Sequence, residues 1–366
     1  MSSSIAFLKL TRHRRLTPVA KAAQSAIMQK RRWVWGKMLA AVAALLVGLG
    51  GCVYTDKPPQ TVTVPVPVSN ITPEAADASA MFWHALQGDS YEDLPAAINA
   101  LQAVADAHPD YPKLNMLLGM AYAWLYFGQY SPGADKMRAD PAYEAMLAQA
   151  IPRAVSTLAH ARELAPSDRI LPGFLTTMQF VQARVNHDQA AEDAAYAGLL
   201  ANTKAYPQFQ GFVQGWVLTS MYPANSPRFN DGINGYFATL NSCVGFKVSR
   251  TDPSAPEFVF NILAKADPAC YNTSIAPHNL EGTFLGLGDA FAKEGKLTQA
   301  RASYENVMRV PGYPGWAYMH MLEARLQKLN QLQADFTKGN GQERVIPGEP
   351  AMFFQGFYAC SACHGA

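Results

Sequence analysis

The chain has 366 residues, of which 49% are hydrophobic and 16% are charged, and its formal net charge is +2. The first 52 residues hold nine of the 30 Lys and Arg residues and none of the 28 Asp and Glu residues. The remaining chain therefore carries 21 basic and 28 acidic groups, a net charge of −7. This acidic balance removes the support for a nucleic-acid partner, which requires clustered positive charge.

The N-terminal segment is built like an export signal. Four basic residues between positions 30 and 37 precede an apolar run at 38–49, which is too short to cross a bilayer. The run ends in "LGGC", which resembles a bacterial lipobox, where the cysteine receives a lipid. An ordinary signal anchor that contains a cysteine is the alternative. Met28, rather than Met1, is a candidate for the true start, because the 27 residues before it contain no acidic group.

The lipobox resemblance implies that residues 1–52 are a signal peptide and that Cys52 is acylated. The protein is then expected to be lipid-anchored in a bacterial cell envelope. No aspartate follows Cys52, so the outer membrane, facing the periplasm, is favoured over the inner membrane.

Residues 53–71 are rich in Pro, Val and Thr, a composition typical of an extended linker. The fold is expected to begin at Thr72, as the N-cap of a helix whose first residue is Pro73.

From about residue 75 to 330, apolar residues recur at helical spacing. The clearest unit resembles the tetratricopeptide repeat, a pair of antiparallel helices with small residues at their contact. Its marker residues are Phe284, Leu287, Gly288, Phe291, Ala300, Tyr304 and Pro311. Gly288 and Ala300 are expected to let the two helices approach, while Phe291 and Tyr304 fill the groove between them.

Three earlier segments repeat the second-helix pattern in degenerate form. They are Ala97, Leu101, Val104 and Pro109; Ala154, Leu158, Ala161 and Pro166; and Ala195, Leu199, Asn202 and Pro207. The second unit also has a first helix, with Leu118, Gly119 and Tyr122 in register, but 35 positions separate Gly119 from Ala154 against 12 in the clear repeat. The 23 extra residues are expected to form a loop that projects from one face.

The expected fold class is therefore all-α, a tetratricopeptide-like solenoid of helical hairpins. Degenerate repeats are expected at 72–207, an irregular helical region at 208–283, and a clear repeat with a following helix at 284–330. Residues 331–366 are expected to form a tail.

That tail contains Cys360, Cys363 and His364 in the pattern C-x-x-C-H, which is typical of covalent c-type haem attachment. About ten residues resemble the first helix of class I cytochrome c domains. The resemblance implies one haem c, bonded to both cysteines, with His364 as an axial iron ligand. Alternatives are a structural or redox cysteine pair, or a metal site, although the tail shows no fourth zinc ligand.

The sixth iron ligand stays open. Candidates are Met352, close to the motif in sequence, and four residues in or beside the last repeat: His278, Met319, His320 and Met321. Each of these is also a common packing or surface residue.

Two cysteines remain, Cys243 and Cys270. Outside the cytoplasm such a pair is expected to form a disulfide, and two buried free thiols are the alternative.

The sequence thus favours a mono-haem c-type cytochrome lipoprotein that transfers single electrons to or from a redox partner docked on the solenoid. One alternative is an envelope scaffold that binds peptides without a functional haem. Another is a haem protein with an open iron position that binds small ligands or reduces peroxide. Whether the protein is an enzyme stays open, with a non-enzymatic electron carrier favoured, because no hydrolase or kinase motif is evident.

Overall fold

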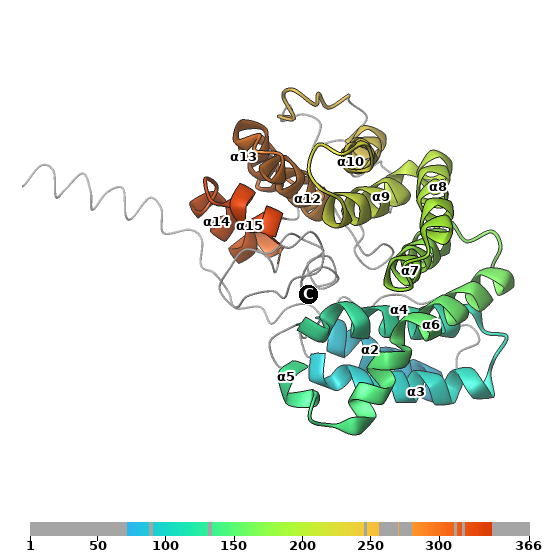
Figure 1. The fold of residues 1–366 in the computed structure, drawn as a ribbon. Helices are drawn as coiled ribbons and strands as arrows, with labels where there is room; N and C mark the ends of the chain where they lie inside the picture. The colour runs from blue at the N-terminus through green and yellow to red at the C-terminus, as the bar shows by residue number, and fades with distance from the viewer. Residues whose placement is uncertain are drawn as a thin grey trace, which may run out of the picture. The chain divides into compact units, whose positions relative to one another are not determined.

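The computed structural model describes residues 72–87, 91–130, 134–244, 247–255, 270, 280–310, 313–316 and 319–338. These residues form helices, turns and irregular connections and contain no strand, which confirms the expected all-α class (Figure 1). None of the helices described there is both long and apolar enough to cross a membrane.

The first of the described helices begins where the capping signal predicts. Helix α2 runs over Pro73–Gln87, and the Thr72 hydroxyl accepts a hydrogen bond from the Ala75 N–H at 3.3 Å. The side-chain oxygen satisfies one of the amide groups that has no partner within the first turn.

Successive helices pack against one another in pairs. The pairs are α2 with α3 (Leu94–Ala107), α4 (Pro112–Phe127) with α6 (Pro141–Leu164), α7 (Leu171–Val185) with α8 (Gln189–Ala205), α9 (Pro207–Met221) with α10 (Pro227–Val244), and α12 (Leu280–Lys293) with α13 (Leu297–Val307). Each pair also contacts the next through its neighbouring helices. Short helices η1 (Tyr91–Asp93), η2 (Gly128–Tyr130), α5 (Ala134–Met137) and η5 (Tyr313–Gly315) lie in the connections.

The repeat markers within the described residues lie at the contact between α12 and α13, whereas Pro311 lies outside those residues. In α12 and α13, Phe284, Phe291, Ala300 and Tyr304 are fully buried. A Cβ atom added to Gly288 would lie 2.3 Å from the Tyr304 ring. The tyrosine ring can therefore pack against α12 only because position 288 has no side chain. The close approach expected between these two helices therefore has a direct packing basis.

The degenerate units follow the same packing. Gly119 of α4 faces Leu158 of α6, where an added Cβ would lie 2.6 Å from the leucine side chain. Asn202 stands in α8 where the pattern asks for an apolar residue. Its amide nitrogen donates to the Pro172 carbonyl and to the Thr176 hydroxyl of α7, so the polar side chain is satisfied at the contact.

The insertion is mainly helical, and the expectation of a projecting loop was wrong. α4 continues eight residues past Gly119, whereas α12 continues five past Gly288. The connection at 128–140 contains η2 and α5, and α6 then begins thirteen residues before Ala154. Most of the added residues therefore extend α4 and α6 or form short helices between them.

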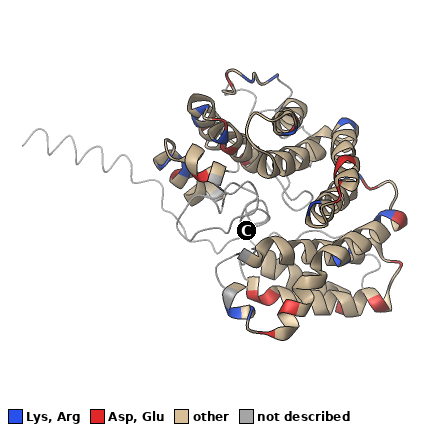
Figure 2. Ribbon diagram, viewed as in Figure 1, with Lys and Arg blue, Asp and Glu red and all other residues tan. Residues whose placement is uncertain are grey.

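The expected irregular region begins with two regular helices. α9 contains no charged residue (Figure 2). Every residue from Phe209 to Ser220 is buried. Added Cβ atoms on Gly211 and Gly235 would each lie 2.6 Å from the other's carbonyl oxygen. Close backbone packing outweighs the cost of about 1 kcal/mol that each glycine imposes on a helix.

The expected tail also begins with a helix. α14 covers Met319–Gln327 and ends before the expected tail. α15 covers Leu332–Lys338, inside the expected tail, and packs against α12. Leu332 and Phe336 of α15 are fully buried in the same apolar core as α9, α10, α12 and α13. The helical body therefore extends eight residues beyond the boundary expected at residue 330.

Candidate functional sites

The haem-attachment residues Cys360, Cys363 and His364, and the lipidation candidate Cys52, lie outside the described residues. The same holds for His278 and Met352 among the candidates for the sixth iron ligand. These assignments stay predictions from the sequence.

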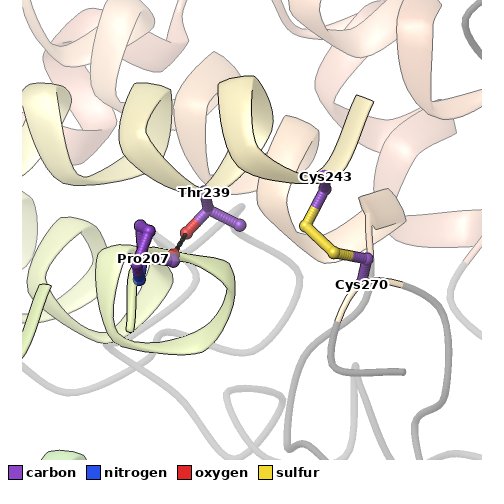
Figure 3. Close-up of a disulfide and its surroundings, with 4 residues drawn as sticks. All are labelled: Pro207, Thr239, Cys243 and Cys270. Atoms are coloured by element: carbon purple, nitrogen blue, oxygen red, sulfur yellow. Dashed lines mark hydrogen bonds between the residues drawn. A yellow bond between two sulfur atoms is a disulfide. The ribbon is translucent and has the colours of Figure 1, made fainter. Parts of the chain in front are cut away.

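Cys243 and Cys270 are joined in a disulfide, with their Cα atoms 5.5 Å apart (Figure 3). Cys243 lies near the end of α10, and both residues are buried. One turn earlier, the Thr239 hydroxyl donates to the Pro207 carbonyl at the start of α9. The disulfide therefore ties Cys270 to a helix that is itself attached to α9.

The three described candidates for an iron ligand lie at the start of α14 in different environments. Met321 is buried at 7% exposure in the core, so ligation would require it to leave its packing site. Met319 is partly buried against the same core, whereas His320 is exposed. Of the three, His320 has the side chain most accessible for ligation, and its exposure alone assigns no role.

A buried ion pair joins α12 to α14. Arg325 donates to Asp289 through Nε at 2.6 Å and through Nη2 at 2.8 Å, and the two side chains are 2% and 0% exposed. The Tyr304 hydroxyl of α13 donates to the same carboxylate at 2.8 Å. Burial alone would lower the pKa of Arg325, but the Asp289 charge outweighs it and the pKa is raised. All three polar groups are engaged with one another, which favours a structural role.

Two other ionisable residues of α12 are buried. The Lys293 ammonium donates to the carbonyls of Thr219, Ser220 and Tyr222 at the end of α9, at 3.0, 3.4 and 3.0 Å. It therefore caps that helix, although burial lowers its pKa to about 8. Burial raises the pKa of Glu281, in the first turn of α12, to about 7.

A half-buried network connects the pairs α7–α8 and α9–α10. Glu192 accepts hydrogen bonds from the Tyr222 hydroxyl and from Arg228 at 3.0 Å, and it lies 3.5 Å from Arg184. Arg228 also donates to Asp193. Burial raises the pKa of Tyr222 to about 12. Because these charges neutralise one another, the network also favours a structural interpretation.

The described residues contain no group of three or more His, Cys, Asp or Glu side chains placed to hold a metal ion. An apolar cavity lies among α2, α4, α6, α7 and α9, with Trp124, Phe174 and Phe212 in its lining. Its volume is about 40 Å³. A cavity that binds benzene is about 150 Å³, so this one is too small for an aromatic ligand.

A larger groove of about 500 Å³ lies where α4, α6 and α7 meet. One wall comes from the end of α4 and from η2 (Tyr126, Gln129), a second from the inserted part of α6 (Leu147, Ala148, Ile151, Pro152), and a third from the end of α7 (Gln182, Val185, Asn186). No charged residue lines it. The volume falls within the range of about 300–1,000 Å³ that is usual for ligand sites.

Sequence reasoning did not single out this groove. One available signal was the count of 23 inserted residues, and another was Pro152, which lies inside α6 two residues before the repeat marker Ala154. The remaining lining residues come from the ends of two other helices, and only the packing of those helices places them beside α6.

No family model, curated protein or solved structure matches the chain. The fold and the candidate sites therefore rest on the residues and contacts described above.

Proposed function

We propose that the protein is an exported, membrane-anchored, mono-haem c-type cytochrome lipoprotein that transfers electrons to or from a docked redox partner. The observation that carries the proposal is the C-x-x-C-H motif formed by Cys360, Cys363 and His364. A c-type haem, when bound, supplies an iron that cycles between two oxidation states. The two thiols and the imidazole are the donor set that this group requires.

The disulfide supports the compartment that the proposal requires. Disulfides persist in oxidising environments outside the cytoplasm, and haem is attached to c-type cytochromes after export. With Cys243 and Cys270 paired, the remaining cysteines are Cys52, in the lipobox-like "LGGC", and the two cysteines of the terminal motif. Each cysteine thus has a place in one consistent account.

The helical body has a defined part in this account. Its ionic clusters are internally paired and bind helices to one another, as the Asp289–Arg325 contact shows. Electron transfer requires no bond to a substrate, so a rigid scaffold that holds the haem-bearing segment near a partner is sufficient.

The deciding experiment is a haem stain after denaturing electrophoresis of protein made together with the cytochrome c maturation machinery. Wild-type protein should stay coloured, and its mass should be higher by one haem. The variants Cys360→Ala and Cys363→Ala should lose most of the stain, whereas a Cys243→Ser, Cys270→Ser variant should keep it. Colourless wild-type protein, from cells that mature another c-type cytochrome, would contradict the proposal.

The anchor needs a separate test. Labelling with a fatty-acid probe should mark wild-type protein and should be lost in Cys52→Ala. Equal labelling of the two proteins would remove the lipoprotein assignment and leave the haem assignment standing.

A further inference from the structure

The groove between α4, α6 and α7 offers hydrogen-bonding groups that the helices do not use. Pro152 has no N–H, so the Ala148 carbonyl four residues earlier lacks its usual intrahelical donor. Both residues line the groove. The inserted part of α6 therefore presents a backbone acceptor to whatever occupies it.

The opposite wall supplies carboxamide groups. Gln182 and Asn186 lie one turn apart at the end of α7, and both line the groove. The helix ends there because His187 takes a left-handed conformation, with φ of 54°, and the Asp188 N–H donates to the Ala183 carbonyl at 2.8 Å. A carboxamide donates and accepts like a peptide group, so this wall matches a peptide backbone.

The groove also has apolar surface. Val185 is 50% exposed, which is high for a large hydrophobic residue, and it stands between the two carboxamides in sequence. On the α6 wall, Leu147 is half-buried and Ile151 is buried. On the α4 wall, Gln129 is held by its own bond to the Tyr126 carbonyl at 2.7 Å. An occupant therefore needs backbone N–H donors and large apolar side chains, and needs no charge.

The C-terminal part of the chain contains a segment with this chemistry. Residues 350–358, "PAMFFQGFY", hold five large apolar or aromatic side chains and no charged residue, and every residue after Pro350 has an N–H. Residues 53–71 are a poorer match, because four prolines remove N–H donors. Thirteen residues separate Lys338, the end of α15, from Met352, a reach of roughly 45 Å when extended.

We propose that the groove is the docking site for residues 350–358 of the same chain. The Ala148 carbonyl and the Gln182 and Asn186 carboxamides pair with the segment's backbone, and Val185 packs against its aromatic side chains. This contact fixes the segment that immediately precedes the C-x-x-C-H motif against the helical body. The docking depends on residues 350–358 and is independent of haem attachment.

Photo-crosslinking in the full chain tests the contact. Val185 is replaced by p-benzoylphenylalanine, and Met308, which is 43% exposed on the surface at the end of α13, is replaced in a matched control. After irradiation, mass spectrometry should join position 185 to residues 350–358 within one chain, and position 308 should give no such product. Crosslinks to residues 53–71, a crosslinked dimer, or no crosslink at position 185 would overturn the proposal.

Hydrogen exchange provides a second measurement that does not use the bulky crosslinker. Val185→Asp places a charge among uncharged lining residues and should speed exchange across residues 350–358 about tenfold, while α4, α6 and α7 stay protected. Met308→Asp should leave it unchanged. Equal exchange in wild type and Val185→Asp would overturn the proposal. Repeating the comparison in a Cys360→Ala, Cys363→Ala background separates the docking from haem attachment, since the docking effect should persist there.

Discussion

The buried contact between Asp289 and Arg325 predicts a specific pattern of stability changes. Replacing Asp289 with Leu leaves the guanidinium of Arg325 without a counter-charge at 2% exposure, and it removes the acceptor of the Tyr304 hydroxyl. Removing one partner of a buried pair costs about 3–5 kcal/mol. Arg325→Met should lower the free energy of unfolding by a similar amount, because it leaves the buried Asp289 carboxylate without its cationic partner.

The double variant Asp289→Leu, Arg325→Met should be much less destabilised than the sum of the two single variants. Replacing both charges with apolar groups leaves no unpaired charge in the core and is often close to neutral. Tyr304→Phe is the matched control: it removes one hydrogen bond to the same carboxylate and should cost only about 1 kcal/mol.

Urea unfolding followed by tryptophan fluorescence gives the four free energies of unfolding, provided that the slope with denaturant is unchanged. The coupling energy between positions 289 and 325 should exceed about 2 kcal/mol, within the range measured for residues in one network. If the losses in the single variants simply add in the double variant, the pair does not act as a unit and the reasoning fails.

Three further changes test other features of the described body. Cys243→Ser with Cys270→Ser should lower the free energy of unfolding by about 3–4 kcal/mol in the absence of reductant, because the disulfide closes a separation of 27 residues; an unchanged urea midpoint would show that it does not stabilise the fold. Gly288→Ala should lower the free energy of unfolding by about 1–3 kcal/mol, since the new methyl group would lie 2.3 Å from the buried Tyr304 ring. The control Gly198→Ala in α8, where the nearest atom would be 3.1 Å away, should be close to neutral. The pKa of Glu281 is about 7 in the folded protein against 4.5 in the unfolded chain. The free energy of unfolding should therefore fall by up to about 3 kcal/mol as pH rises through this interval, because only the folded state keeps the proton. Glu281→Gln should lack this loss, and an identical pH dependence in both proteins would argue against a buried, protonated carboxyl group.

The parts of the fold that the sequence predicted correctly depend on local signals. Thr72 followed by Pro73 marks a helix start through capping, which involves neighbouring residues alone. The repeat markers Gly288 and Tyr304 predict a close helix contact, because a small residue and a large one recur at helical spacing. The paired helical architecture follows from such patterns.

The errors fall where local composition and packing disagree. Residues 230–235, "NDGING", are turn-forming types inside the region expected to hold irregular helices, yet they lie within the continuous helix α10. Gly235 there faces Gly211 of α9, and this backbone contact between residues 24 positions apart stabilises both helices. The inserted residues were expected to form a loop, but much of the insertion is helix, and α6 carries Pro152 in its interior.

The sequence by itself determined the all-α class, the start of α2, the positions of the repeat markers and the motifs that support the proposed function. Those features require only capping chemistry, periodic burial or the spacing of reactive side chains. The tertiary structure alone decided that Asp289 meets Arg325, that Lys293 caps α9, and that the insertion and the end of α7 form an uncharged groove. The groove brings together residues from helices separated by long stretches of chain, and their proximity results from the crossing of packed helices, which no local pattern records.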